Sequence, residues 1–541
     1  MGSIGEPDLD YDVIVIGAGL SGIFSLYRMT QLGLRTCALE TGSSEGGTWY
    51  WNQYPGCRFD SESWSYGFSF SQEVLDEWDW SEHFAGQPEI LRYAEFVTKK
   101  FDLRRYMKFD VDVESAHWRE ESRSWLLTDS KGRTYSSRFV ITAMGILSKP
   151  TLPTTIEGVH GFERECFHTT RWPKDWSPSG KRVGIIGTGA TAIQIIQEIV
   201  KSDLKTLTVF QRTPNWSAPL RNEPITTEEM QEIRQRYPEI FERCRESYSG
   251  FVHMPHMVKT SDVSDEERMA YWEKIYATRG FEKWQSNFSD IGTSREANAL
   301  VSKFFADKVR ERVNDPDTAE KLIPKCHGFG TRRVPLETHY FEAYNKPNVR
   351  LVDIKNESPI AKITPKGVLL ETGEEVELDT LIYATGFDAV TGPISAVDIR
   401  GVDGVKITDV WKNGPRTFLG FLTRGIPNMM MVMGPHQMFG NIPRSIEYAV
   451  NWIGTFIEYC VKKDITRVEA KQKKVDEWTQ HVFDCAQGLL ANEIDSWMTG
   501  VNTNVKGKQH RIIARYQGPG PGFRKRILDV AAREYEDISM S

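Results

Sequence analysis

Residues 11–22 read Tyr-Asp-Val-Ile-Val-Ile-Gly-Ala-Gly-Leu-Ser-Gly, and this stretch decides the fold. The β-branched run at 13–16 is typical of a strand that is buried on both faces of a parallel sheet. Gly17, Gly19 and Gly22 then form a G-x-G-x-x-G turn. Such glycines allow a tight turn, a close approach of the backbone to a pyrophosphate, and close packing of the next helix on the strand.

The residues after this turn supply the context that a glycine pattern needs. Residues 23–33 have a helical pattern, and a second apolar strand at 36–39 ends at Glu40. Glu40 follows Gly17 by 23 residues, the spacing at which an acidic side chain accepts hydrogen bonds from a ribose. The pyrophosphate is then expected at the N-terminus of the helix. The sequence therefore predicts a Rossmann-like dinucleotide-binding domain.

A second copy of the pattern begins with a strand at 181–186. Gly187 and Gly189 form its turn, and Ala192 takes the third position before an apolar helix at 193–200. Two dinucleotide folds in one chain indicate a flavin in one and a nicotinamide in the other. The acid of the first fold favours FAD there.

The second fold differs from the first near the position of the acid, where Arg212 and Thr213 stand. An arginine at this place favours the 2′-phosphate of NADPH, and an exposed cation at the end of a strand is the alternative. Thr191 and Gln194 are candidate cofactor contacts at the start of the second helix. The alternative for Gln194 is an ordinary solvated polar residue.

The chain passes between the two folds more than once. Strands at 139–145 and 381–388 contain small residues near their ends, which let a backbone approach a cofactor closely. Between about 224 and 325, helical segments with charged faces predict an insertion. The fold class is therefore α/β, with two Rossmann-like domains, parallel central sheets and a mainly helical insertion. The expected parts are 1–145 and 382–541 for FAD, 146–223 (with a linker) and 331–381 for NADP, and 224–330 for the insertion, with a mobile loop in the C-terminal part.

Composition excludes several classes of protein. The chain has 541 residues, of which 40% are hydrophobic and 26% charged, as in an ordinary globular protein of about three to four domains. The net charge of −7 offers no basic excess for nucleic acid. Seven scattered cysteines without a C-x-x-C pair predict reduced thiols in the cytoplasm, and the histidines form no set of metal ligands. The sequence has no run of about 18 apolar residues, and the acidic stretch 1–12 does not resemble a signal peptide.

Two long motifs carry a resemblance to a known family. Residues 46–60 match the pattern G-G-x-W-x-x-x-x-[FY]-P-G-x-x-x-D of the type I Baeyer–Villiger monooxygenases. Residues 162–173 resemble that family's fingerprint F-x-G-x-x-x-H-x-x-x-W-P, except that Arg164 stands where the family has glycine. Residues 330–336 and 495–500 resemble the family's basic pair and its late mobile loop. The resemblance covers nearly the whole chain and is closest to the cyclohexanone-monooxygenase-like branch.

This resemblance implies an NADPH-dependent flavin monooxygenase that acts as a monomer. It would insert one oxygen of O2 beside a ketone carbonyl, through a flavin C4a-peroxide, to give an ester or a lactone. The alternative is a flavin-containing monooxygenase that oxidises nitrogen or sulfur, but such enzymes usually lack the Trp-Pro that occurs here at Trp172-Pro173. A flavin-binding scaffold or NADPH oxidase is a further alternative. A flavin disulfide reductase would need a redox pair of cysteines, which Cys37 and Cys57 do not provide.

The resemblance also implies roles for individual residues. Arg333 is the expected catalytic cation beside the reacting oxygens, and Asp60 its orienting carboxylate. Arg332 is expected at the NADP phosphate together with Arg212. His168 is expected to support the movement of the linker rather than to act as a base. The other implied contacts are Gly47, Trp49 and Tyr54 beside the flavin, Trp172 in the linker, and Phe439 and Trp497 in the substrate pocket, with Trp497 also near the cofactors.

Overall fold

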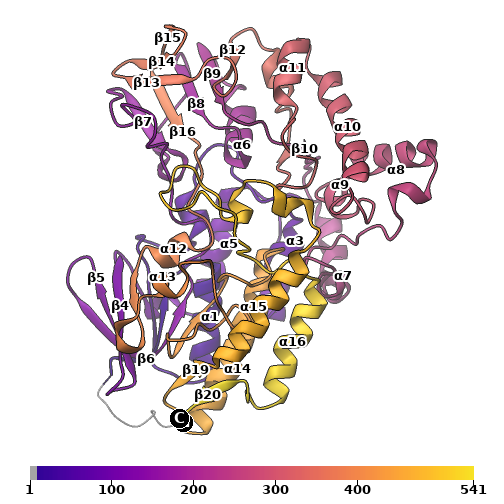
Figure 1. The fold of residues 1–541 in the computed structure, drawn as a ribbon. Coiled ribbons are helices and arrows are strands. Elements are labelled where there is room, and N and C mark those ends of the chain that lie inside the picture. The colour runs from indigo at the N-terminus through magenta and orange to yellow at the C-terminus, as the bar shows by residue number, and fades with distance from the viewer. Residues whose placement is uncertain (1–8) are drawn as a thin grey trace.

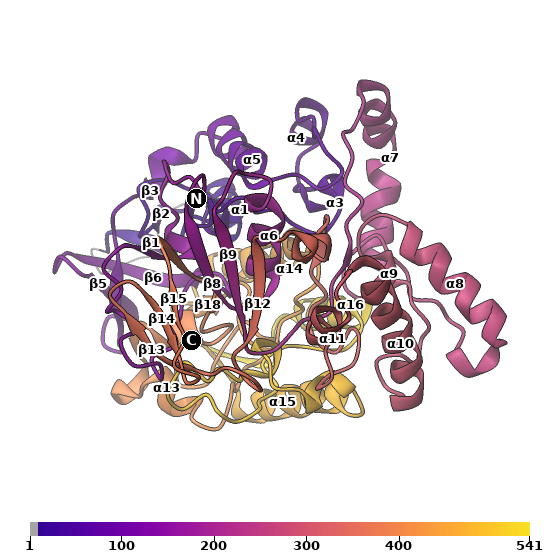
Figure 2. The ribbon, with the colours of Figure 1, turned by 90° about the horizontal axis from the view of Figure 1, so that it is seen from above.

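The structure is a computed structural model that describes residues 9–541. The prediction that the N-terminus is not a signal peptide falls mainly on residues outside this range. The chain forms two lobes, each built on its own sheet, and a group of helices that projects to one side (Figures 1 and 2).

The first lobe contains the larger sheet, in which β1 (Tyr11–Ile16) lies between β2 and β6. Both pairings of β1 are parallel, as the apolar run predicts, whereas β5 pairs in antiparallel fashion with β4 and with β6. The other strands of this sheet are β2 (Thr36–Leu39), β3 (Met107–Lys108), β4 (Val113–Arg119), β5 (Ser124–Asp129), β6 (Thr134–Thr142), β17 (Asp398–Arg400) and β18 (Met429–Met431).

Helices from both ends of the chain complete this lobe (Figure 1). The helix α1 (Leu20–Gln31) follows the first glycine turn and packs against α14 (Ile442–Lys462). Their approach is close, because a Cβ at Gly454 would stand 2.7 Å from Cγ of Arg28. Other helices of this lobe are α2 (Thr48–Trp51), α3 (Ser63–Tyr66), α4 (Gln72–Glu77), α5 (Gln87–Lys100), α12 (Gly392–Ser395), α13 (Ile407–Val410), α15 (Gln472–Ala486) and α16 (Gly520–Ala532).

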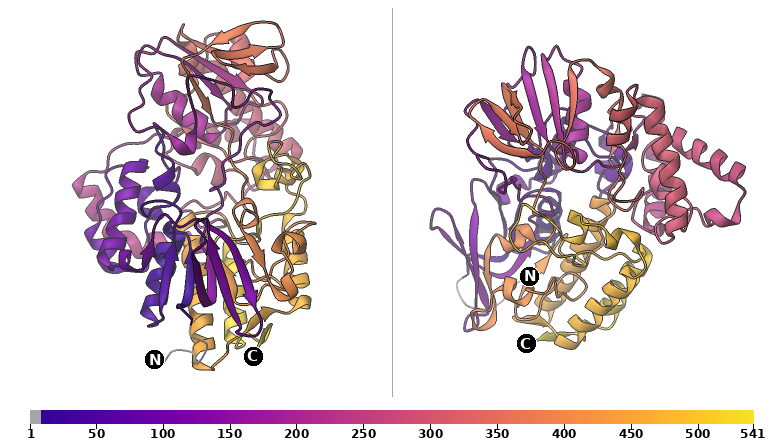
Figure 3. Two further views of the ribbon diagram at one scale, coloured as in Figure 1. Left: turned by 90° about the vertical axis from the view of Figure 1, so that its left-hand side faces the viewer. Right: turned by 45° about the horizontal axis from the view of Figure 1, so that its top comes forward.

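The second lobe contains a five-stranded sheet in which every pairing is parallel. Its strand order is β12 (Val349–Asp353), β9 (Thr206–Gln211), β8 (Arg182–Ile186), β16 (Thr380–Tyr383) and β7 (Glu165–His168). The helix α6 (Ala190–Ile199) follows the second glycine turn. A separate antiparallel sheet of β13 (Ile360–Thr364), β14 (Gly367–Leu370) and β15 (Glu375–Glu377) lies beside this lobe (Figure 3).

One expected boundary needs correction. The division between residues 381 and 382 falls inside β16, and all four residues of this strand pair with β7 and β8 in the second sheet. The return to the first lobe therefore follows Tyr383. Composition does not reveal this position, because an apolar strand looks the same in either sheet.

The elements between 224 and 330 are all helices, as the charged amphipathic pattern predicts. The main ones are α7 (Thr227–Glu246), α8 (Asp265–Ala277), α9 (Glu282–Gln285), α10 (Arg295–Arg312) and α11 (Pro316–Leu322). Side chains cap several of them: the Oγ1 of Thr226 accepts from the backbone N of Glu229 at 3.1 Å, and Ser264 forms a capping box with Glu267. None of the helices within residues 9–541 combines the length and hydrophobicity needed to cross a bilayer.

Candidate active site

A cavity of about 1070 Å³ is lined by residues of both glycine turns and by residues of the helical insertion. Gly17 and Gly19 line it from the first lobe, and Thr191 and Gln194 from the second. Of the other residues predicted for a site, Glu40, Gly47, Trp49, Tyr54, Asp60, Arg333, Phe439 and Trp497 line it as well. Gly22, Gly187, Gly189, Ala192, Arg212, Thr213, Arg332, His168 and Trp172 do not.

The first turn has the tight geometry that its glycines predict. Gly17 has a φ of +104°, and a Cβ there would stand 2.6 Å from the carbonyl oxygen of Ala143. A Cβ at Gly22 would stand 2.0 Å from the carbonyl oxygen of Gly17, so Gly22 serves the packing of helix on strand rather than the cavity. Gly19 faces the cavity, where its nearest neighbour is Gly47.

Glu40 closes the same end of the cavity. Its carboxylate accepts from the backbone N of Ala18 and from that of Gly42, both at 2.7 Å. Burial raises the pKa of Glu40, and these two hydrogen bonds oppose the rise. The carboxylate therefore lies at the N-terminus of α1, where the sequence predicts a ribose contact.

The motif at 46–60 joins the two lobes. The phenol of Tyr54 donates to Oε1 of Gln194 at 3.0 Å, and Nε2 of Gln194 donates to the carbonyl oxygen of Arg58 at 3.0 Å. Gln194 is 3% exposed, so the alternative of a solvated polar residue is wrong. On the other side of the motif, the indole of Trp49 donates to the hydroxyl of Tyr66 at 3.2 Å.

Asp60 and Arg333 meet in the cavity although they are far apart in sequence. Nη2 of Arg333 donates to Oδ2 of Asp60 at 2.6 Å. The aspartate side chain is 1% exposed, and the arginine side chain is 36% exposed. Burial raises the pKa of Asp60, while the adjacent guanidinium opposes that shift. The carboxylate is thus fixed inside the protein, and part of the cation remains accessible to a ligand.

Burial lowers the pKa of Arg332, and the positive charge of the nearby Arg212 lowers it further. The late loop continues past Gly500 to residue 503, and both arginines hold it. Nη1 of Arg212 donates to Oγ1 of Thr503 at 2.7 Å, and Nη2 of Arg332 donates to the carbonyl oxygen of Asp495 at 2.6 Å. The carbonyl oxygen of Thr213 accepts from Oγ1 of Thr188 in the second glycine turn at 2.9 Å.

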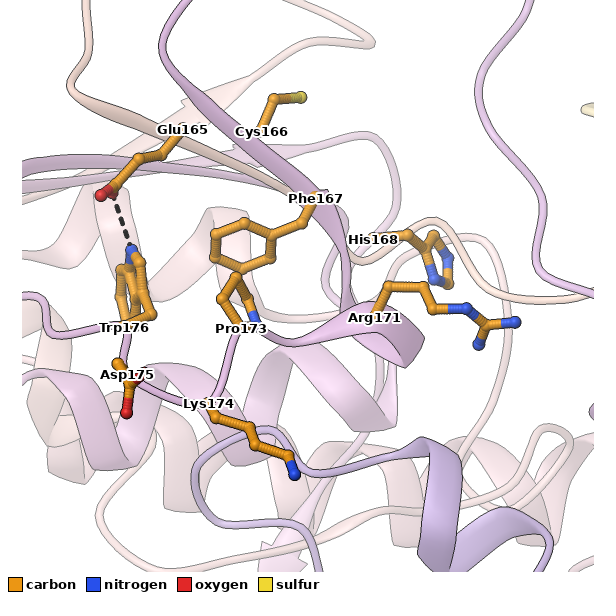
Figure 4. A pocket seen from close by; sticks show the side chains of 9 residues that line it. All are labelled: Glu165, Cys166, Phe167, His168, Arg171, Pro173, Lys174, Asp175 and Trp176. Carbon is orange, nitrogen blue, oxygen red and sulfur yellow. Dashed lines mark hydrogen bonds between the residues drawn. The ribbon is translucent and has the colours of Figure 1, made fainter. Parts of the chain in front are cut away.

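The fingerprint segment lines a neighbouring cavity of about 660 Å³ (Figure 4). His168 ends β7, and its Nδ1 accepts from the backbone N of Thr170 at 3.2 Å. Burial lowers the pKa of His168 to about 4, so the ring is neutral at neutral pH. The ring of Trp172 stands edge-on to Phe167 and to Trp176, with centroids 4.9 Å apart in each pair. This geometry is that of a packed structural segment.

Arg164 does not need the conformation that a glycine would provide. Its φ lies outside the left-handed region. Nη1 donates to the carbonyl oxygen of Leu378 at 2.7 Å and to Oδ1 of Asp379 at 2.9 Å. Asp379 also pairs with Arg182, so Arg164 joins β7 to the sheet through a charged cluster. The structure therefore accommodates an arginine at the position where the family has glycine.

Sequence reasoning missed several residues that line the main cavity. The guanidinium of Arg171 lies 3.9 Å from the ring centroid of Trp51, and both residues line the cavity. This contact connects the fingerprint segment to the motif at 46–60. Aromatic residues of the insertion also reach the cavity, and so does Arg515 near the C-terminus. The aromatic residues are Phe251, Phe281 and Trp284. No local pattern marks them, because the contacts are made only when distant segments fold together.

The glycine turns fit their cofactors, since each precedes a helix N-terminus that faces the same cavity. Two glycine-rich nucleotide turns on separate sheets, with one shared cavity, define an oxidoreductase that uses two dinucleotides. Residues 14–304 match the family described as pyridine nucleotide-disulphide oxidoreductase.

Comparison with known proteins narrows this class. The chain is 41% identical to the 2-oxo-Δ3-4,5,5-trimethylcyclopentenylacetyl-CoA monooxygenase of Pseudomonas putida, with 98% of each chain covered. It is 39% identical to the cyclohexanone 1,2-monooxygenase of an Acinetobacter species, over 93% of this chain and 92% of that protein. A crystal structure of OTEMO with FAD and NADP superposes with a TM-score of 0.94 at 40% identity, covering 99% and 100% of the two chains. The chain belongs to the Baeyer–Villiger monooxygenases, which use FAD and NADPH.

The cysteines agree with this assignment. Cys57 lines the cavity, but it is a free thiol, and burial raises its pKa to about 12. A thiol of that kind is not the nucleophilic thiolate that disulfide exchange requires. Among residues 9–541, no group of three or more His, Cys, Asp or Glu side chains is arranged to hold a metal ion.

Proposed function

We propose that Arg333, held by Asp60, is the group that directs oxygen insertion into a ketone bound in the 1070 Å³ cavity. The contact between the two side chains carries this proposal. By analogy with the cyclohexanone and cyclopentanone monooxygenases among its relatives, we assign cyclic ketones as the substrate class. FAD belongs to the first lobe and NADPH to the second, with the boundary placed after Tyr383.

When bound, FAD that has been reduced by NADPH would activate O2, which is the source of the inserted oxygen atom. Gly17, Gly19 and the N-terminus of α1 hold its pyrophosphate, and Glu40 holds its ribose. Trp49 and Tyr54 pack beside it, and Gly47 leaves the space that this packing needs. In the second lobe, Gly187 and Gly189 give NADPH the same kind of turn, with Thr191 and Ala192 at the start of the helix.

The work of the protein is to place a fixed positive charge where negative charge develops. The guanidinium of Arg333 donates hydrogen bonds to the carbonyl oxygen of the ketone as that oxygen gains negative charge. Asp60 keeps the guanidinium oriented by accepting its hydrogen bond. Because Asp60 is buried, its carboxylate is not exchanged for water as the partner of Arg333. Aromatic residues, including Phe439 and Trp497, exclude water from the reacting carbon.

We also assign the 2′-phosphate of NADPH to Arg212 and Arg332, with Thr213 beside them. Two adjacent arginines form a site for a dianionic group, and burial of Arg332 strengthens the interaction by lowering the local dielectric. Both arginines hold the late loop that includes Trp497, so occupation of this site is coupled to the position of that loop.

The protein is further proposed to act as a cytoplasmic monomer that binds no nucleic acid. The seven cysteines are all free thiols, which fits a reducing compartment. The net charge of −7 disfavours binding to a phosphate backbone. Sedimentation of the purified holoenzyme tests the oligomeric state, and a dimer would contradict it.

Replacement of Arg333 by alanine tests the proposal. We expect the variant to bind FAD and to consume NADPH, but to release hydrogen peroxide and to form product about 10²–10³-fold more slowly. Product and NADPH are to be measured in the same reaction. Arg58→Ala is a matched control, because Arg58 also lines the cavity but pairs with Glu82 at 3.2 Å. Near-normal product formation by Arg333→Ala would contradict the proposal.

A further inference from the structure

Arg515 is a cation of the main cavity that the reaction described above does not use. The backbone holds it rigidly from both sides. The carbonyl oxygen of Ala514 accepts from the backbone N of His436 at 3.0 Å, and the backbone N of Tyr516 donates to the carbonyl oxygen of Gln437 at 3.0 Å. The position of Arg515 at the cavity wall is therefore fixed by its neighbours.

The guanidinium of Arg515 has no anionic partner within residues 9–541. It takes part in none of the ion pairs or hydrogen bonds found there, and its buried Nε has no acceptor. Other arginines of the cavity wall are occupied: Arg333 pairs with Asp60, Arg58 pairs with Glu82, and Arg171 lies over Trp51. Burial lowers the pKa of Arg515 to about 10, which leaves it charged at neutral pH.

Arg515 is partly exposed and its Nε is buried, and a cation that is partly removed from water without a counter-charge is costly. An anion from outside the protein would supply the missing partner. The phosphates of the two cofactors already have sites at the glycine turns and at the pair Arg212 and Arg332. Arg515 instead follows Ala514, which clusters with Val390. The predicted substrate-pocket residues Phe439 and Trp497 pack against the same cluster. The unpaired cation thus belongs to the end of the cavity assigned to the ketone.

We propose that Arg515 binds the carboxylate of a substrate that carries both a ketone and a carboxylate group. A planar guanidinium offers two parallel donors that match the two oxygens of a carboxylate. This inference rests on the proposed function, because it requires the ketone to lie beside Arg333. In one substrate, Arg333 then orients the reacting carbonyl and Arg515 anchors the distant acid.

Kinetics with a matched pair of ketones tests the inference in the FAD-loaded enzyme. The acid is cyclohexanone with a carboxylate on the ring carbon opposite the carbonyl, and the neutral partner is its methyl ester. We expect the wild type to favour the acid in kcat/KM by roughly 10–100-fold, the range of a charge-assisted hydrogen bond. Arg515→Met is expected to abolish this preference, and Arg515→Lys to keep part of it.

Two further measurements separate charge at this position from general effects. Lys149→Met removes an exposed cation from the same cavity wall and is expected to leave the preference unchanged. Cyclohexanecarboxylate, which has no ketone, is expected to raise the melting temperature of the wild type but not of Arg515→Met. The uncharged cyclohexanecarboxamide is expected to raise neither.

Several results would overturn the inference. A wild type that oxidises the methyl ester at least as well as the acid has no anion anchor. An unchanged preference in Arg515→Met assigns the anchor elsewhere, and a loss of bound FAD or a raised KM for NADPH in that variant assigns Arg515 to a cofactor. If neutral ketones give esters while the acid is not favoured, only this inference fails. If neither ketone gives an ester, the proposed function fails as well.

Discussion

The pair Asp60 and Arg333 combines a fully buried carboxylate with a cation that is 36% exposed. This asymmetry suits a residue that must be oriented on one side and bind a ligand on the other. Their side chains are 273 positions apart in sequence, so spacing alone cannot predict the contact. The long motif that ends at Asp60 and the basic pair at 332–333 indicated both residues by resemblance, and the fold brings them together.

His168 is a residue type that often transfers protons, but its surroundings do not favour that role. It lies outside the main cavity, and burial lowers its pKa to about 4. Because the ring is already neutral at higher pH, it has no proton to lose across the neutral range. We expect His168→Gln to lower kcat by a similar factor at every point from about pH 6 to 9, the range that a base with an ordinary histidine pKa would dominate.

The measurement is the pH dependence of product formation for both proteins. Thr170 provides a control, since Thr170→Val removes a neighbour of the His168 ring without touching the imidazole. If His168→Gln loses one limb of the pH profile and Thr170→Val keeps it, His168 transfers a proton and the structural assignment is wrong.

At the scale of elements, the first glycine turn shows how one motif serves two purposes. Gly22 allows α1 to pack on β1, whereas Gly19 leaves space on the cavity side. A Cβ at Gly19 would stand 3.3 Å from Cα of Gly47, so the larger branches of a valine would project into the space assigned to the pyrophosphate. The sequence predicted the turn but not its closeness to Gly47, because Gly47 belongs to the separate motif at 46–60.

We therefore expect Gly19→Val to fold but to be purified without FAD. The measurement is the ratio of flavin absorbance to protein absorbance. Gly33→Asn is the control, because Gly33 lies beyond the other end of α1, has a φ of +72° and has no heavy atom within 4 Å of the added Cβ. Stoichiometric FAD in Gly19→Val would mean that the first turn is not the FAD site.

The strands and helices around these turns were largely predictable, because buried parallel strands and amphipathic helices have strong sequence patterns. The runs at 13–16 and 181–186 correspond to β1 and β8. The domain boundary at β16 could not be predicted, since the apolar residues of this strand do not specify which sheet they join. The ion pair of Arg164 could not be predicted either, because its partner Asp379 lies 215 positions away.

At the scale of the whole molecule, the late loop links the two lobes through their charges. We assign Arg212 and Arg332 to the nicotinamide cofactor, and each donates a hydrogen bond to the loop at 495–503. The hydrogen bonds to Thr503 and to the carbonyl oxygen of Asp495 use only some of the N–H donors of Arg212 and Arg332. A phosphate can therefore be added without breaking an ion pair.

We expect Arg212→Ala to raise the KM for NADPH by roughly 10-fold or more and to change the KM for NADH little, as for the loss of one charge-assisted contact. Steady-state kinetics with each cofactor measures this difference. Arg171→Ala removes a cation near the cavity that is not assigned to the phosphate, and it is expected to affect the two cofactors equally. An equal loss for NADPH and NADH in Arg212→Ala would contradict the phosphate assignment.

Isotope analysis of the product tests the central claim most directly. The FAD-loaded enzyme is given NADPH, cyclohexanone and O2 labelled with oxygen-18, and the product is examined by mass spectrometry. Insertion of one oxygen atom beside the carbonyl predicts a seven-membered lactone that carries a single labelled atom in its ring. NADPH consumption that yields only hydrogen peroxide, or a lactone without label, would contradict the account.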